Sequence, residues 1–229
     1  MAKKVVKKTK IKLLNILILL AFFAGISYGI YYSFQIPIKN IIISDTQYLN
    51  DDYIITLAGI KDYPSFLLTR TSKMKKDITK SKYIKEVKVR KKYGFKIYLD
   101  VKESMPLFFD MNKNMFILDN KEAVNDYDIC SSFRVPRLLN YVPDVKYDSF
   151  IKNMGKIDKA VLSKISDIEY KPNDYDKDRF LLYMDDGNMV YLTLTKFKTI
   201  NHYIEVLAQL ENHKGVLYLD NGNHFKIME

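Results

Sequence analysis

The chain has 229 residues, a formal net charge of +10 and a single cysteine, Cys130. One cysteine excludes an internal disulfide, so any folded domain must be held together by packing alone. Six lysines fall within residues 1–12. The remainder is only modestly basic and lacks the charge pattern of a nucleic-acid-binding protein.

A long uncharged stretch follows this tail, because residues 13–38 contain no Asp, Glu, Lys, Arg or His. As a helix, Leu13–Phe34 would be roughly 33 Å long, enough to cross a hydrocarbon core of about 30 Å. A buried core helix of this length would normally show a polar face, and this stretch has none. It is also longer than the apolar run of a cleaved signal peptide. The sequence predicts an uncleaved transmembrane helix over residues 13–35.

The lysines beside this helix predict its orientation. Lysine-rich flanks tend to stay in the cytoplasm, so we expect residues 1–12 to be cytoplasmic and the rest of the chain to be extracytoplasmic. An exported domain without disulfides suits a bacterial cell membrane. The tail could also bind nucleic acid, but it lacks interleaved aromatic residues and a binding fold behind it. The expected partner is therefore the lipid bilayer and not a nucleic acid.

Residues 36–104 predict a first exterior domain. Ile41–Ile43 form a β-rich run, and Asn50 is a suitable N-cap for a helix that ends at Gly59. A second helix is expected over Ser72–Lys80, with its apolar residues four apart facing inward.

The clearest pattern in the chain is a hairpin. Val87 and Val89 alternate with charged residues before a Tyr93-Gly94 turn, and apolar residues alternate again from Phe95 to Val101. Period-two alternation on both sides of a turn predicts two paired strands with one buried face. The order strand, helix, helix, strand, strand gives two helices on a three-stranded sheet, an α+β unit.

This order, behind a basic tail and a single anchor, resembles the FtsQ/DivIB family of bacterial cell-division proteins, whose membrane-proximal unit is a POTRA domain. The matching segments are Ile41–Thr46, Ser81–Val89 and Val101–Pro106. Two positions depart from the family pattern. Tyr83 stands where the family's short lead into this strand usually has Pro, and Glu103-Ser104 replaces the usual Glu-Arg.

Residues 105–229 predict a second exterior domain, a mixed β-sheet with helices, which also resembles the family. The expected elements are a strand over Met115–Leu118, an amphipathic helix from Phe150 to Ile165, a strand beginning at Ile168, a hairpin over Phe180–Leu192, a helix from Thr195 to Leu210 and a closing strand over Val216–Asp220.

Catalytic and metal-binding patterns are missing from the sequence. His202, His213 and His224 have no metal-ligand spacing, and there is no phosphate-binding glycine loop or nucleophile elbow. Two acidic groups could suggest calcium, Asp185-Asp186 and Asp174-Asp176-Asp178, but the second lacks the glycine and distal glutamate of an EF-hand loop, and both are expected to be solvated turns. We expect no enzymatic activity, no cofactor, no metal and no small-molecule substrate.

Two surfaces are candidates for binding. Basic residues of the hairpin (Lys88, Arg90, Lys91, Lys92) are either an ordinary solvated face or a contact for anionic lipid headgroups, wall polymers or an acidic partner. The closing strand is either internal or an open sheet edge that accepts a strand from another protein, with candidate residues Val216, Leu217, Tyr218, Leu219, Asp220 and Phe225.

The resemblance favours the open edge, because it implies that the C-terminal domain binds small division proteins of the FtsL/DivIC and FtsB type. It further implies a single-pass scaffold that is enriched at the division septum and helps to control septal peptidoglycan synthesis. The alternatives are a membrane-anchored cell-wall enzyme or its regulatory subunit. A POTRA-bearing transport component would need several such units or a barrel domain.

Overall fold

The computed structural model describes residues 13–125, 127–130, 133–210 and 213–228. The predicted cytoplasmic tail, residues 1–12, lies outside the described residues. Contacts divide the chain into two compact units: the first holds the N-terminal segment up to Asp45, Asn50–Ile78 and Val87–Val101, and the second holds Thr46–Leu49, Thr79–Glu86 and the chain from Lys102 onward. Because the two units interleave, this division does not test the boundary predicted between residues 104 and 105.

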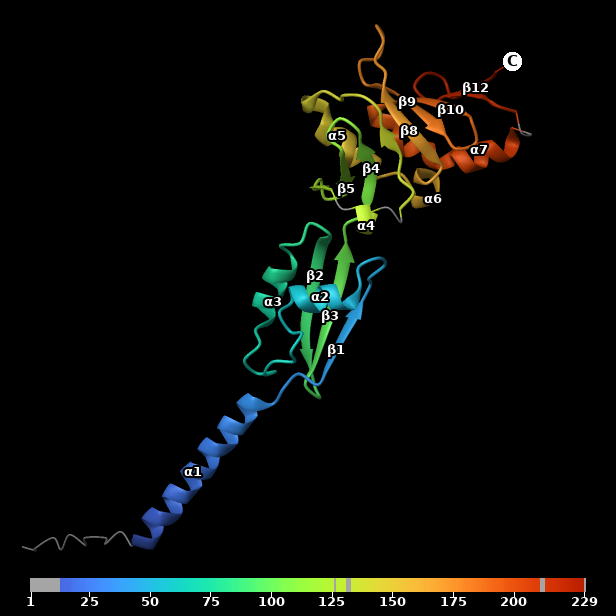
Figure 1. Cartoon of the computed structure of the whole chain (residues 1–229). Helices are drawn as coiled ribbons and strands as arrows, with labels where there is room; N and C mark the ends of the chain where they lie inside the picture. The colour runs from blue at the N-terminus through green and yellow to red at the C-terminus, as the bar shows by residue number, and fades with distance from the viewer. Residues whose placement is uncertain (1–12, 126, 131–132, 211–212, 229) are drawn as a thin grey trace, which may run out of the picture. The chain divides into compact units, whose positions relative to one another are not determined.

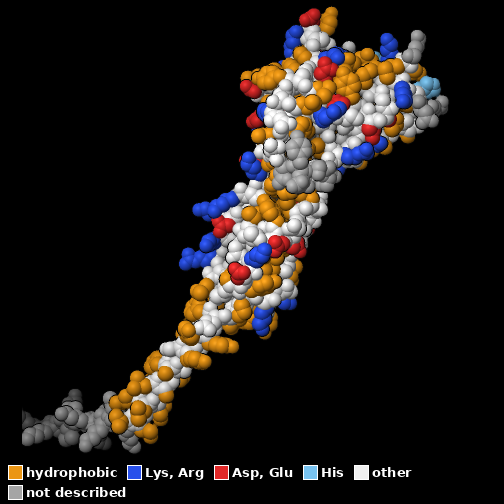
Figure 2. All heavy atoms as spheres, viewed as in Figure 1, with side chains coloured by type: hydrophobic (Ala, Val, Ile, Leu, Met, Phe, Trp, Pro, Cys, Tyr) orange, Lys and Arg blue, Asp and Glu red, His pale blue; other side chains and the backbone are white. Residues whose placement is uncertain are grey.

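The first element is α1 (Leu13–Gln35), a helix with no buried residue. It is long and apolar enough to cross a membrane, and its visible face carries hydrophobic side chains along its length (Figure 2). The hydroxyl of Ser33 donates a hydrogen bond to the carbonyl oxygen of Gly29 at 2.8 Å, so this polar group is satisfied within the helix. The prediction of an apolar helix over residues 13–35 is confirmed.

A three-stranded sheet follows, in the order β1 (Asn40–Ser44), β3 (Lys96–Glu103), β2 (Ile84–Lys92). β1 runs parallel to β3. The helices α2 (Asp51–Leu57) and α3 (Thr71–Ile78) lie over this sheet (Figure 1).

The predicted local signals form these elements. The Asn50 side chain accepts the backbone N–H of Tyr53 at 2.7 Å, which caps α2. Gly59 ends this segment with a φ of +66°, a left-handed conformation that favours glycine. Ile97, Leu99 and Val101 of β3 are buried, as are Met74 and Ile78 of α3, so the alternating face of the hairpin and the inner helix face form the core.

A nine-stranded mixed sheet organises the C-terminal part, in the order β12-β11-β10-β9-β8-β7-β4-β5-β6. In chain order the strands are β4 (Pro106–Asp110), β5 (Met115–Leu118), β6 (Ala123–Val124), β7 (Arg137–Leu138), β8 (Ile165–Tyr170), β9 (Arg179–Met184), β10 (Met189–Thr193), β11 (Gly215–Tyr218) and β12 (His224–Ile227). β10 and β9 pair antiparallel as the predicted hairpin, whereas β11 pairs parallel to β10. The prediction of an α+β fold with a mixed C-terminal sheet is confirmed.

The helices of this part are α4 (Tyr127–Cys130), α5 (Asp144–Met154), α6 (Lys159–Leu162), the 3-10 helix η1 (Leu194–His202) and α7 (Tyr203–Gln209). Phe150 of α5, Phe180 of β9 and Phe197 of η1 meet at the centre of the core. The rings of Phe150 and Phe180 stack with centroids 5.0 Å apart, and Phe197 meets the Phe180 ring edge-on at 5.2 Å. Such aromatic contacts stabilise a core beyond the area that they bury.

Two helix predictions are wrong. The single helix expected from Phe150 to Ile165 breaks after Met154, where Gly155 forms the C-cap of α5, and Ile165 already begins β8. The segment expected as an α-helix from Thr195 starts instead as the 3-10 helix η1. Because a 3-10 helix has three residues per turn, Phe197, Ile200 and Tyr203 face the core and Ile204 is 42% exposed.

Candidate partner-binding edge

β12 is one of the two outermost described strands of the C-terminal sheet, and β6 is the other. β11 lies between β10 and β12, and β12 is the outermost described strand on this side. The edge predicted along Val216–Asp220 is therefore covered by another strand, and of the predicted edge residues only Phe225 belongs to the outer strand. Partner binding by these residues stays a prediction.

The register of the β11–β12 pair defines which backbone groups face outward. Tyr218 lies opposite His224 and Gly215 opposite Ile227, and beyond them the N–H of Met228 donates to the Lys214 carbonyl at 2.9 Å. Because hydrogen-bonded and non-hydrogen-bonded pairs alternate in an antiparallel ladder, His224 and Lys226 turn their backbone groups toward β11. Phe225 and Ile227 then turn their N–H and C=O groups away from the sheet.

An apolar groove lies beside this edge. Its volume is about 500 Å³, and its apolar lining residues are Val206, Leu210, Leu217, Leu219 and Phe225, with Thr199, His202, Gln209 and Asn223 as polar neighbours. The Phe225 side chain is partly buried against the main core. Ile227 is 53% exposed, so the outer end of β12 presents an apolar side chain to solvent.

The opposite face of the same strands holds a ladder of rings. Tyr191, Tyr218 and His224 stack across three neighbouring strands, with centroids 5.4 and 4.7 Å apart. The Arg179 guanidinium lies 3.6 Å from the centroid of Tyr191 and donates to the Asp220 carboxylate at 2.6 Å. Tyr218 and Asp220, predicted as partner-binding residues, are thus engaged in contacts within the sheet.

Gly215 allows β12 to approach β11 closely. A Cβ at this position would lie 2.2 Å from the carbonyl oxygen of Lys226 and 2.6 Å from the Phe225 ring. Its N–H donates to the buried Asn188 side chain at 2.8 Å, which fixes the start of β11. The sequence does not reveal this role, because a close approach between strands leaves no local signal.

The structure does not gather the four predicted anion contacts at one point. Lys88 is exposed, and Arg90 donates to the Asp100 carboxylate at 2.5 Å. Lys91 donates to the Phe66 carbonyl oxygen, and its partial burial lowers the pKa of its ammonium group. Lys92 lies 4.8 Å from the ring centroid of Tyr98. Anion binding by these residues stays a prediction.

Metal-binding chemistry finds no support among the described residues, where no group of three or more His, Cys, Asp or Glu side chains could hold a metal ion. Cys130 is buried in a small apolar cluster with Phe116, Leu118 and Val124. Asp186, in the turn between β9 and β10, accepts a hydrogen bond from the Tyr203 hydroxyl at 2.7 Å. Cys130 and Asp186 therefore both make contacts within the fold.

The family model for the FtsQ-type POTRA domain matches residues 36–104. The cell-division protein DivIB of Geobacillus kaustophilus is 28% identical over 200 residues, covering 84% of this chain and 77% of that protein. DivIB of Bacillus anthracis is 27% identical over 220 residues, covering 94% of this chain and 81% of that protein. The chain is therefore similar to DivIB cell-division proteins over most of its length, and residues 36–104 match an FtsQ-type POTRA domain.

A solved structure of the major extracytoplasmic domain of DivIB, in its trans isomer, from Geobacillus stearothermophilus is also similar. It is 23% identical, covers 48% of this chain and 96% of that one, and superposes with a TM-score of 0.39. The similarity to DivIB proteins and the apolar helix α1 support a membrane-anchored division protein with an extracytoplasmic domain.

The glutamate of the family motif, Glu103, has a structural role. Its carboxylate accepts the backbone N–H groups of Gln47 and Leu49 at 2.9 Å each and that of Tyr48 at 3.2 Å. The Tyr48 hydroxyl in turn donates to the Ser104 carbonyl oxygen. Burial and the nearby Glu103 carboxylate raise the pKa of Tyr48, so its phenol stays protonated and able to donate.

Proposed function

We propose that this protein is a non-enzymatic scaffold of the division machinery whose C-terminal sheet captures an extended segment of a partner along the outer side of β12. The partners are of the FtsL/DivIC and FtsB type, as the family resemblance implies. Through them the protein would help to control septal peptidoglycan synthesis, and it would be enriched at the septum. The observation that carries the proposal is the outward-facing backbone of Phe225 and Ile227 beside an apolar groove.

Strand addition explains how such an edge produces affinity and selectivity. Backbone hydrogen bonds to the edge are available to any extended peptide, whereas pockets that receive alternate side chains select the sequence. Here the groove between β12 and α7 offers an apolar surface next to the edge. A partner segment with apolar residues at every second position would satisfy both.

A pair of substitutions on neighbouring residues tests the edge. Ile227→Pro removes an outward N–H and leaves the inward hydrogen bonds of Lys226 to β11 in place, whereas Lys226→Ala leaves the whole backbone intact. In full-length protein recovered from membranes with its partners, Ile227→Pro is expected to weaken binding about fivefold or more, since a hydrogen bond is worth about 1 kcal/mol. Lys226→Ala should bind normally.

Equal partner recovery for both variants would refute strand addition at β12. A tagged full-length copy should gather at the division septum, and even distribution around the membrane would refute septal enrichment. An extracytoplasmic domain that altered wall material unaided would refute the non-enzymatic role and favour a wall enzyme.

A further inference from the structure

Two loops of the first unit are hydrogen-bonded to the residues that directly follow the membrane anchor. The Phe66 N–H donates to the Ile36 carbonyl at 2.9 Å, and the Ile38 N–H donates to the Pro64 carbonyl at 3.0 Å. The Lys39 N–H donates to the Phe95 carbonyl, in the turn between β2 and β3, at 2.9 Å. We call the segments Tyr63–Leu68 and Lys91–Lys96 the membrane-proximal tips.

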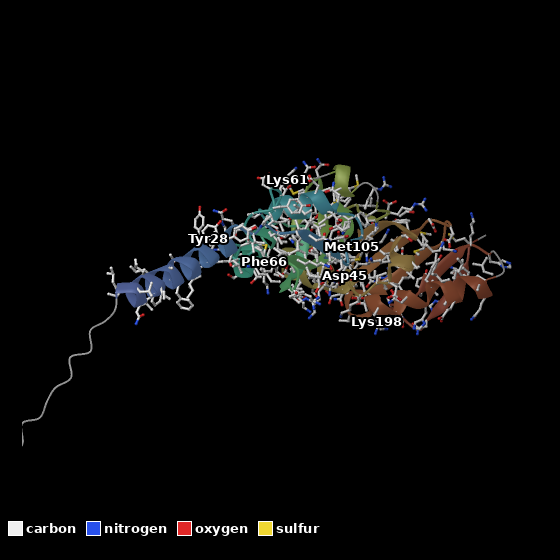
Figure 3. The ribbon with its side chains drawn as sticks, turned by 90° about the horizontal axis from the view of Figure 1, so that it is seen from below. Tyr28, Asp45, Lys61, Phe66, Met105 and Lys198 are labelled. Carbon is white, nitrogen blue, oxygen red and sulfur yellow. The ribbon has the colours of Figure 1, made fainter. Side chains whose placement is uncertain are left out.

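Chain connectivity keeps these tips close to the bilayer. α1 ends at Gln35, and the three hydrogen-bonded residues, Ile36, Ile38 and Lys39, lie within the next four. Four residues span at most roughly 14 Å when fully extended, so the tips stay near the membrane surface whatever the tilt of α1. Phe66 lies at the end of the domain where the chain enters from α1 (Figure 3).

The tips expose apolar side chains. Leu67 is 47% exposed, Leu68 is 64% exposed, and Tyr63 is 48% exposed. Tyr93, at the turn of the hairpin, is completely exposed. Aliphatic and tyrosine side chains at the end of a domain beside a transmembrane helix are of the kind found at the lipid–water boundary.

Lysines are interleaved with these side chains. Residues 36–40, 61–68 and 91–96 contain five lysines and one acid, Asp62. The Lys39 ammonium lies 5.4 Å from the ring centroid of Phe95, and the Lys91 ammonium lies 4.8 Å from that of Phe66. The Phe66 and Phe95 rings themselves meet edge-on at 5.5 Å, so the two tips form one surface. Lysines beside apolar tips can place their charge among anionic headgroups.

We propose that the membrane-proximal tips dock on the outer surface of the bilayer that holds α1. Leu67, Leu68 and Tyr93 enter the boundary between headgroups and acyl chains, and the surrounding lysines contact anionic lipid headgroups. The docked tips fix the first exterior domain against the membrane, because the hydrogen-bonded linker leaves little slack between helix and domain. This inference does not depend on partner binding at β12.

The absence of tryptophan from the sequence provides a direct test. Leu68→Trp gives full-length protein a single indole at the tip, and Tyr175→Trp gives a control indole at a residue that is 99% exposed in the second unit. Both are reconstituted in vesicles of phosphatidylcholine and phosphatidylglycerol, with and without brominated acyl chains. The indole at position 68 should emit at shorter wavelength and lose intensity to the bromines, whereas the indole at 175 should do neither.

Further measurements test the headgroup contact and the docking separately. Removal of phosphatidylglycerol, or Lys92→Gln in the Leu68→Trp background, should reduce the quenching; unchanged quenching would overturn the headgroup contact. An indole at position 68 that behaves like that at 175 in every vesicle would overturn the docking itself. If it were protected only in native membranes, the tips would be covered by a protein and not by lipid, which also overturns the proposal.

Discussion

Gly215→Ala should separate β12 from β11 and thereby disrupt the proposed binding edge. The added Cβ would lie 2.2 Å from the carbonyl oxygen of Lys226, where ordinary contacts are at least 3.4 Å. This neighbour is backbone and cannot rotate away. Because β12 has a described strand on one side only, the expected relief is an outward shift of β12 by about 1.2 Å at this position.

The expected cost is moderate for folding and large for binding. Overpacking of this kind destabilises proteins by about 1–3 kcal/mol, which for a domain of this size lowers the melting temperature by roughly 2–12 °C. A shifted strand no longer presents its outward N–H and C=O groups in register. Loss of two backbone hydrogen bonds to the partner would lower affinity about thirtyfold.

Gly155→Ala is the matched control. Gly155 has a φ of −65°, and a Cβ there would meet its nearest neighbours at 3.6 Å, an ordinary contact. Hydrogen–deuterium exchange of residues 224–227, thermal melting and partner recovery are measured for both variants. If the Gly215→Ala protein kept the exchange protection of β12 and bound its partner like Gly155→Ala, the close approach would not matter and the reasoning would be refuted.

Three further substitutions test the supports of the fold. Glu103→Gln should lower the free energy of unfolding by about 1–3 kcal/mol, because a buried carboxylate that accepts three backbone N–H groups loses its charge. In the same chemical denaturation experiment, substitution of the exposed Glu122 by Gln should be near neutral. Arg179→Met should cost about 3–5 kcal/mol, since the Asp220 side chain is only 9% exposed, and Arg179→Met/Asp220→Asn should recover part of it; equal losses would contradict the ion pair. Burial, with the hydrogen bond to a glutamate second, raises the pKa of Tyr183 to about 12. The unfolded state then loses this proton first, so stability should fall between about pH 10 and 12, and Tyr183→Phe should flatten that slope in denaturation at several pH values.

Elements with a strong local signal were predicted well. The β2–β3 hairpin has alternating residues on both sides of a turn, and Gly94 takes a φ of +82° there. α2 has its own cap in Asn50. In these cases the residues that determine the structure are neighbours in sequence, so their pattern is visible without knowing the tertiary fold.

The two helix errors have a common cause. Apolar residues at spacings of three and four fit either one continuous α-helix or two shorter helices. In this structure α5 ends at Met154, and Ile165 is already paired in β8. The buried residues Phe197 and Ile200 of η1 and Tyr203 at the start of α7 follow a spacing of three, which a 3-10 helix places on one face. Whether such a segment forms an α-helix or a 3-10 helix depends on how it packs against the sheet, and the tertiary fold determines this packing.

The position of the proposed binding edge depends on contacts that are even less local. β12 contributes only four residues, His224–Ile227, and although polar and apolar side chains alternate in it, so short a run does not show which strand it pairs with. What makes the pairing possible is the missing side chain at Gly215, and what anchors β11 is Asn188 in the turn of another hairpin. An edge strand is defined by the lack of a neighbouring strand on one side, and this is known only from the complete strand order of the sheet. The proposed edge therefore lies one strand outside the predicted residues of β11, and Phe225 belongs to both; partner binding by the predicted residues stays a prediction.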